Sequence, residues 1–134
     1  MMFKSNHRIY IEEDNHSIYQ QLVKRGHEKP DDFPFASMKD VFMLAVSLGR
    51  QHNAYRSIQV QKDIFAGDVL DPKTDIAILV AISFEKHQKF EMLLDPKLIL
   101  ETAQSYANGG ISFIEDMLLK QPGRPLNNLV NLIA

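Results

Sequence analysis

The most constraining feature of the sequence is the segment from Ser37 to Gly49, which predicts a helix that is apolar on nearly every side. Ser37 is a good N-cap, and Asp40 places a carboxylate in the first turn, where it favours a helix N-terminus. A helix of this kind belongs in the interior of a fold, so we expect it to be the central helix and to end at Gly49. Its apolar residues are Met38, Val41, Phe42, Met43, Leu44, Ala45, Val46 and Leu48.

Length and composition limit what can surround this helix. The 134 residues, of which 45% are hydrophobic and 24% charged, suffice for one core. The formal charge of −2 offers no overall attraction to nucleic acid, so any such contact needs a local basic patch. The absence of cysteine excludes disulfides, thiolate zinc sites and a cysteine nucleophile. The longest apolar run, Ile76 to Ile82, is too short to span a bilayer, so we expect a cytoplasmic protein without a membrane partner.

The regions on either side of the central helix are expected to differ. Residues 1–14 form an N-terminal arm, extended or folded as a short edge strand, because residues 8–12 alternate weakly. Residues 15–134 form a single helical domain, whose first helix begins near Asn15 and stops at Gly26. Residues 50–70 read as a polar loop with one helical turn around residues 62–65.

Two Asp-Pro pairs mark further helix starts, at Asp71 and Asp95. The apolar run within residues 72–86 is also typical of a buried strand, but the length of the segment favours a helix. After Asp95 the apolar residues keep the same helical spacing across residues 108–110. This spacing predicts one bent helix, or two nearly collinear ones, in which the glycines let a neighbouring backbone come close. Residues 126–133 form a short terminal helix. The expected fold is therefore all-α, a bundle of about five to six helices around a buried central helix.

The sequence contains no nucleophile elbow, phosphate-binding loop or dinucleotide fingerprint. Asp31 and Asp32, with His27 nearby, resemble a carboxylate pair for acid–base or magnesium chemistry. Aspartates after a proline more often make turns by bonding their own backbone. We expect no catalytic residue, no metal and no cofactor, and a small metal-dependent nuclease remains the less favoured alternative.

The segment from Arg50 to Arg56 is the candidate interaction surface. It offers the groups that contact phosphates and stack on bases, namely two guanidinium groups, a histidine, amides and a tyrosine. The alternative is a hydrated loop that caps carbonyls at a helix end. Lys24 and Arg25 would lie alongside if the first two helices pack antiparallel. The candidate residues for nucleic-acid or partner binding are Lys24, Arg25, Arg50, His52, Tyr55 and Arg56.

Two motifs resemble a known family. Residues 35–50 are similar to the "KD-hydrophobic-F-hydrophobic-A-x-x-LG" core of small accessory proteins of bacterial DNA phosphorothioation (dnd) systems, the group numbered associated protein 4. Residues 106–111 resemble the "YAN-G-G" junction of a later helix in that family, and the likeness spans roughly residues 16–133. The matching positions of the first motif are Lys39, Asp40, Val41, Phe42, Ala45, Leu48 and Gly49.

The resemblance implies a defence setting in which sulfur-modified self DNA is distinguished from unmodified invading DNA. It supplies no catalytic residue. We therefore expect a non-enzymatic accessory subunit of an antiphage restriction system. Such a subunit would dock on larger ATPase or nuclease components and could also touch double-stranded DNA through Arg50, His52 and Arg56. A transcriptional regulator with a helix-turn-helix flanking residues 50–58 is the alternative from another class.

Overall fold

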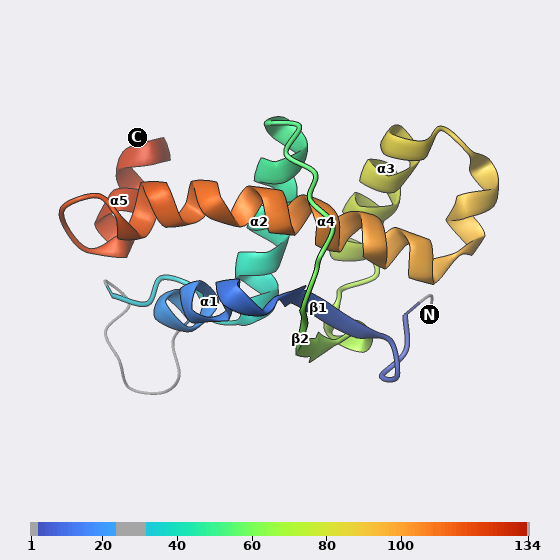
Figure 1. Cartoon of the computed structure of the whole chain (residues 1–134), viewed down its shortest axis with the longest axis horizontal. Helices are drawn as coiled ribbons and strands as arrows, with labels where there is room; N and C mark the ends of the chain where they lie inside the picture. Colours follow the sequence, from blue (N-terminus) through green and yellow to red (C-terminus); the bar gives the residue numbers. More distant parts are fainter. Residues whose placement is uncertain (1–2, 24–31, 134) are drawn as a thin grey trace.

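The computed structural model describes residues 3–23 and 32–133, and within them five helices and two strands follow one another along the chain (Figure 1). Short 3-10 turns at Glu13–Asn15, Gly67–Val69 and Phe90–Leu94 connect some of these elements, and a π-helical turn, Glu115–Leu119, continues the longest helix. The elements in order are β1 (Arg8–Glu12), α1 (His16–Leu22), α2 (Met38–Gln51), β2 (Gln61–Ala66), α3 (Asp75–His87), α4 (Pro96–Ile114) and α5 (Pro125–Ile133).

The expectation of an all-α fold is wrong, because β1 and β2 pair as a two-stranded antiparallel sheet. The domain is mixed α/β with helices predominating, at 63% helix and 11% strand. The alternation of apolar and polar residues in the N-terminal arm does correspond to a strand, in which Ile9 and Ile11 are buried. Residues 62–65, expected as a helical turn, instead lie in β2. Their one buried residue, Phe65, is opposite Ile9 across the sheet.

The element at the centre of the fold is α4 rather than α2. Twelve of the 19 residues of α4 are buried, against five of 14 in α2, so α4 is the helix around which the others pack. The helix α2 keeps Ser47 exposed and Met43 and Leu44 only partly buried, which corrects the expected central helix. As the Asp-Pro signal predicted, α4 begins at Pro96, and the Asp95 carboxylate accepts the Leu98 N–H at 3.2 Å. It runs without interruption through residues 108–110.

Glycines set the crossing of α2 and α4. A Cβ on Gly110 would overlap the carbonyl oxygen of Ala45, and one on Gly49 would overlap the carbonyl oxygen of Tyr106. The two backbones are therefore in direct contact, as the sequence predicted for the glycines of α4. Gly49 does not end its helix, because α2 continues to Gln51; its lack of a side chain serves the crossing instead.

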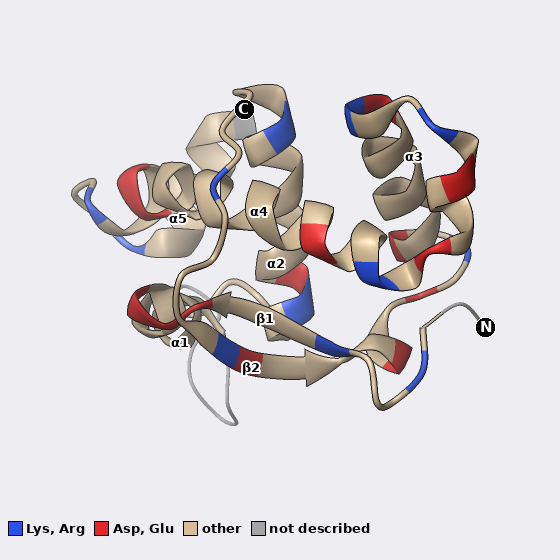
Figure 2. Ribbon diagram, turned by 45° about the vertical axis from the view of Figure 1, so that its right-hand side comes forward, with Lys and Arg blue, Asp and Glu red and all other residues tan. Residues whose placement is uncertain are grey.

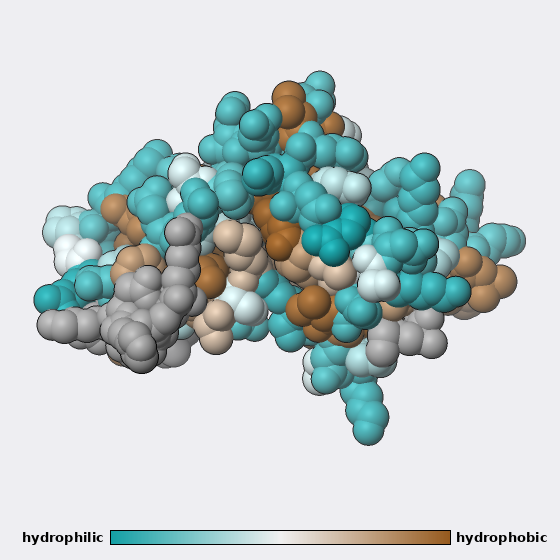
Figure 3. Space-filling view, turned by 90° about the horizontal axis from the view of Figure 1, so that it is seen from below, coloured by the Kyte–Doolittle hydropathy of each residue, from teal (hydrophilic) through white to brown (hydrophobic). Residues whose placement is uncertain are grey.

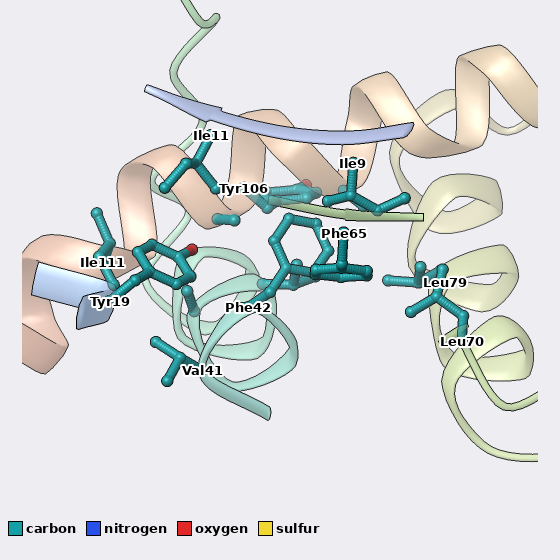
Figure 4. Packing of buried hydrophobic residues seen from close by; sticks show 14 of the residues in the cluster. Ile9, Ile11, Tyr19, Val41, Phe42, Phe65, Leu70, Leu79, Tyr106 and Ile111 are labelled. Atoms are coloured by element: carbon teal, nitrogen blue, oxygen red, sulfur yellow. The ribbon is translucent and has the colours of Figure 1, made fainter. Parts of the chain in front are cut away.

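The core lies between α4, α2, α1 and the sheet (Figure 4). Phe42 of α2 and Phe65 of β2 pack edge to face, with ring centroids 5.7 Å apart and planes at 83°, a favoured aromatic geometry. Tyr19 of α1 is 1% exposed, and burial raises the pKa of its hydroxyl far above the ordinary value. Phe3, ahead of β1, is fully buried in the same core, so the N-terminal arm contributes to it.

The observed ends of the other helices can be compared with the start and stop signals in the sequence. The helix α1 ends at Leu22, and Val23 then pairs with Phe35 in an isolated bridge; the expected stop at Gly26 lies outside the described residues. The Asp71 carboxylate accepts the N–H groups of Lys73 and Thr74, so the predicted start is real, although α3 begins at Asp75. The terminal helix is confirmed as α5. Within the described part of the chain, no helix has the length and apolar character needed to cross a membrane.

Candidate functional site

The predicted contact segment, residues 50–56, carries the chain from α2 onto α4. Asn53 adopts a left-handed conformation, with φ of 52°, and the Ala54 N–H donates to the Gly49 carbonyl at 2.8 Å. This turn ends α2 and reverses the chain. Residues 54–60, called the strap from here on, then run across α4 to β2, so that α2 and the strap lie on two sides of α4 (Figure 1).

The strap is bound to the middle of α4. The Arg56 N–H donates to the Ser105 carbonyl at 3.0 Å. The Asn108 side-chain amide donates to the carbonyl oxygens of Arg56 and Ser57, at 3.2 and 3.3 Å. Gly109 leaves room for the strap, because a Cβ there would overlap the carbonyl of Ala54. The residues 108–109 of α4 therefore fix the path of the strap.

The far end of the strap is bound to β1. The Glu12 carboxylate accepts the backbone N–H groups of Gln59 at 2.9 Å and Val60 at 2.7 Å. These two hydrogen bonds favour the charged form and hold the pKa of Glu12 below its ordinary value. The strap thus has anchors on both α4 and the sheet.

Arg50 is committed to an ion pair. Its Nε and Nη2 atoms donate to the two carboxylate oxygens of Glu85 on α3, at 2.9 and 2.7 Å. This bidentate arrangement is the strong form of the arginine–carboxylate contact, and it lowers the pKa of Glu85. A phosphate could bind this face of Arg50 only by displacing Glu85.

The two rings of the predicted surface also have protein neighbours. His52 stacks on Phe113, with centroids 4.1 Å apart and planes at 15°. Tyr55 packs edge to face on Tyr106, with centroids 4.9 Å apart, and the Lys86 Nζ lies 4.3 Å from the centre of the Tyr55 ring. Such a cation–π contact occupies one face of Tyr55 that a base would otherwise use.

Arg56 differs from the rest of the predicted surface. It is exposed, and its guanidinium makes no hydrogen bond or ion pair to any residue in the described ranges 3–23 and 32–133. Lys24 and Arg25 lie outside those ranges. The structure brings Arg50 and Tyr55 together with three residues that the sequence did not indicate. This set, called the Arg50 cluster, is Arg50, Tyr55, Glu85, Lys86 and Tyr106.

The missed members of the Arg50 cluster come from other helices. Glu85 and Lys86 end α3, and Tyr106 lies in the middle of α4, where burial raises the pKa of its hydroxyl. No local pattern links them to residues 50–56, because the contacts exist only once three helices are packed. A partial signal was present, since Tyr106 belongs to the second motif.

The other chemical candidates are not assembled in the structure. Asp31 and His27 lie outside the described residues, and the Asp32 Oδ1 lies 3.8 Å from the Arg124 Nε. Across the described ranges, no group of three or more histidine, aspartate or glutamate side chains is arranged to hold a metal. After α2 comes the strap and then β2, so the position proposed for a helix-turn-helix contains no second helix.

The charged and apolar groups of the surface are distributed differently. Figure 2 shows basic and acidic residues interspersed along the ribbon, and several are paired, such as Arg8 with Asp63 at 2.8 Å. Apolar atoms form separate patches among hydrophilic ones on the face drawn in Figure 3. The most exposed large apolar side chains belong to the turn after α3, where Phe90 is 73% and Leu94 88% exposed. On α3 itself, Ile78 is 45% exposed.

The fold and the Arg50 cluster define a small, helix-dominated domain built around one long helix. The family model described as DNA sulphur modification system-associated protein 4 matches residues 8–134, so the chain belongs to this family, as its two motifs suggested. No curated protein and no solved structure matches the chain. The two motifs meet in the structure, because the LG end of the first contacts the Tyr106 backbone of the second.

Proposed function

We propose that this protein is a non-enzymatic, cytoplasmic accessory subunit of a DNA phosphorothioation-linked restriction system, and that it acts by docking on larger ATPase or nuclease components. Its membership of a family associated with DNA sulphur modification gives the biological setting. The docking activity is inferred from the surface of the domain. The single observation that carries it is the exposed apolar surface of α3 and the turn that follows.

Phe90, Leu94 and Ile78 are the side chains that support docking. Phe90 and Leu94 share the turn after α3, and Ile78 lies on α3 itself. Exposed large apolar side chains often belong to a protein-binding surface. Phe90 also contacts Phe84 of α3, with ring centroids 4.9 Å apart, so one side of its ring already packs against the domain.

The satisfied polar groups of the site support a non-enzymatic role. Arg50 is paired with Glu85, and the Glu12 carboxylate is used by the strap. General acid–base catalysis needs a titratable group within hydrogen-bond reach of a substrate. The Arg50 guanidinium and the carboxylates of Glu85 and Glu12 are instead used in contacts that hold the domain together, which supports the proposal.

Co-purification with the larger components of the same system tests the docking proposal. The full-length chain, tagged at one end, is mixed with each purified ATPase or nuclease component in turn. We expect a stoichiometric complex with at least one of them. Failure of every component to bind, in both low and moderate salt, would show that docking is not its role.

The structure favours Arg56 as the residue for the proposed contact with double-stranded DNA. Arg56 is exposed and has no hydrogen-bonding or ionic partner for its guanidinium among the described residues, whereas Arg50 is paired with Glu85. Replacing either with Gln removes the same charge, so Arg50→Gln is a matched control for Arg56→Gln. We expect Arg56→Gln to weaken binding to duplex DNA more than Arg50→Gln and to reduce the salt dependence of binding. Equal effects, or no measurable binding of the unaltered protein at low salt, would remove direct phosphate contact from the proposal.

A further inference from the structure

The strand β1 has one edge that pairs with β2 and one edge that faces α4. On the paired edge, the His7 carbonyl and the Glu13 N–H bond to residues that flank β2. The Tyr10 N–H points the opposite way and donates to the Gln104 Oε1 of α4 at 2.8 Å. The helix α4 therefore lies beside β1 on the side away from β2 (Figure 2).

The edge of β1 that faces α4 carries unused backbone groups. Successive residues of a strand direct their N–H and C=O groups to opposite edges, so Arg8, two residues before Tyr10, faces the same way as Tyr10. Among the described residues, the N–H and C=O of Arg8 and the C=O of Tyr10 make no hydrogen bond to α4 or to a loop. An edge of this kind can take up a further strand, whose backbone pairs with the unused groups.

A groove runs along this edge, with a volume of about 300 Å³. It is called the β1–α4 groove from here on. A second hollow, of about 270 Å³ between the strap and α4, shares Gln61, Glu101 and Gln104 with it, so the two are continuous. The main walls of the β1–α4 groove are Arg8 and Tyr10 of β1 and Lys97, Leu100, Glu101 and Gln104 of α4.

Two largely buried polar side chains of α4 present unused groups to these hollows. Gln104 is 7% exposed and Ser105 is 8% exposed. The Oε1 of Gln104 is bound by Tyr10, and its amide NH₂ has no hydrogen-bond partner within residues 3–23 and 32–133. The Ser105 Oγ, which borders the second hollow, has no partner in those ranges either. A ligand that bonds to these groups would satisfy hydrogen-bonding capacity that the fold leaves unused.

We propose that the β1–α4 groove binds an extended segment of a partner protein, which adds to β1 as a third strand of the sheet. The N–H and C=O of Arg8 pair with one residue of the segment, and the C=O of Tyr10 accepts a further N–H. The wall from Lys97 to Gln104 is about 10 Å long, which matches about three extended residues. This surface is separate from the apolar residues of α3 on which the docking proposal rests, and so it goes beyond that proposal.

The charges of the groove favour a polypeptide over a nucleic acid. Arg8 is paired with Asp63. Lys97 and Glu101 carry opposite charges one helical turn apart, and neither has a partner among the described residues. A phosphate backbone would meet one lysine and one repelling carboxylate, whereas nucleic-acid binding depends on neutralising several phosphates. Leu100 is the apolar part of the wall, so we expect an uncharged segment with one apolar side chain, such as valine or leucine, facing α4.

A substitution that removes a single N–H tests the added strand. Arg8 is the first residue of β1, a position where proline is tolerated, and Arg8→Pro deletes the N–H on the open edge. Arg8→Ala is the matched control, because both variants lose the ion pair with Asp63 and only the proline variant loses the N–H. The probe is a peptide selected by the full-length chain from a displayed library of random nonapeptides.

The selected peptide should bind the unaltered chain with micromolar affinity in titration calorimetry. We expect Arg8→Pro to weaken binding by about tenfold or more and Arg8→Ala to weaken it by less than about threefold. Thermal unfolding verifies that each variant folds. Hydrogen exchange provides a readout without any substitution: the peptide should slow exchange of the Arg8 N–H in the unaltered chain and leave the amides of α5 unchanged.

Three results would overturn the inference: a library that yields no binder, equal affinities of the two variants, or protection from exchange away from β1. Displacement of the selected peptide by single-stranded oligothymidylate would also overturn it, because the occupant would then be a nucleic acid. The peptide experiments need no other component of the restriction system. Their outcome is therefore separate from that of the co-purification, which tests docking.

Discussion

The helix α2 meets its two neighbours in opposite ways. Against α4 its backbone is in direct contact, because Gly49 and Gly110 remove the side chains that would keep the helices apart. Towards α3 it makes two ion pairs through side chains, and an open groove lies between the two helices beside the Arg50–Glu85 pair. The contact between α2 and α4 leaves no space between the helices and fixes the fold. The contact between α2 and α3 fixes their relative orientation and leaves part of their surface exposed. Both motifs of the family belong to the first contact.

The largest effect should come from filling the glycine crossing. Gly110→Ala introduces a Cβ that overlaps the Ala45 carbonyl and lies 2.6 Å from the Gly49 nitrogen, and a helix backbone cannot yield as a flexible side chain does. We expect a loss of at least about 3 kcal/mol in the free energy of unfolding, measured by urea denaturation. Gly123→Ala is the control: its φ of 102° is strained for alanine, but its Cβ would lie 3.4 Å from Asn128, and its cost should be about 1 kcal/mol. Similar losses at the two positions would contradict the close contact.

Breaking the ion pair between Lys39 and Asp75 should have an intermediate effect. The Asp75 carboxylate accepts from Lys39 Nζ and from the Asp71 N–H, both at 2.9 Å, and its side chain is 12% exposed. Asp75→Asn should therefore lower the free energy of unfolding by about 2 kcal/mol.

The same ion pair should give a dependence on alkaline pH. The hydrogen bond to Asp75 raises the pKa of Lys39, so its stabilisation is complete below the ordinary lysine pKa and is lost as the pH rises through the raised value. Stability curves of the unaltered chain and Asp75→Asn should thus converge at high pH, and parallel curves would exclude the pair as the cause.

The anchor of the strap should show the reverse dependence on pH. The folded-state pKa of Glu12 is lowered, so its stabilisation is present above the ordinary glutamate pKa and is lost as the pH falls through the lowered value. Glu12→Gln should lower the thermal midpoint at pH 7, and the difference from the unaltered chain should shrink towards pH 3. A difference that stays constant over this range would mean that the charge of Glu12 does not hold the strap.

The smallest effect should come from the ion pair between Arg50 and Glu85. Arg50 and Glu85 are each about half exposed, at 49% and 51%, so water and salt screen their attraction. Arg50→Gln should shift the thermal midpoint less than Asp75→Asn does, and the shift should diminish in 0.5 M salt. A larger loss of stability for Arg50→Gln than for Asp75→Asn would contradict the argument from solvent exposure.

Much of the helical framework could be predicted from the sequence because its signals are local. Ser37 caps α2 as predicted, accepting the Asp40 N–H, and Asp95-Pro96 starts α4. The constant helical spacing of apolar residues through Asn108-Gly109-Gly110 predicted a continuous helical path and a close backbone contact. These features depend on residues within a few positions of one another.

The sheet and the Arg50 cluster depend on distant residues, and so they were missed. The strand β2 is short, and half of its residues are polar or charged. It is stabilised by pairing with β1, whose residues lie 49 to 58 positions earlier in the chain (Gln61 with Glu12, Ala66 with Arg8). Arg50 was predicted to contact a nucleic acid or a partner, and its ion-pair partner Glu85 is 35 residues away in the sequence. The sequence indicates which groups are present, whereas packing decides which of them are already occupied.

The central position of α4 has a consequence for how the protein is made. The crossing partner of α2, the support of α3 and β1, and the carbonyl that receives the strap all belong to residues 96–114. A ribosome delivers these residues after both strands and the helices α1, α2 and α3, so a nascent chain that ends at Asp95 lacks the helix on which those elements pack. Their packing should therefore be completed only after residues 96–114 have left the ribosome.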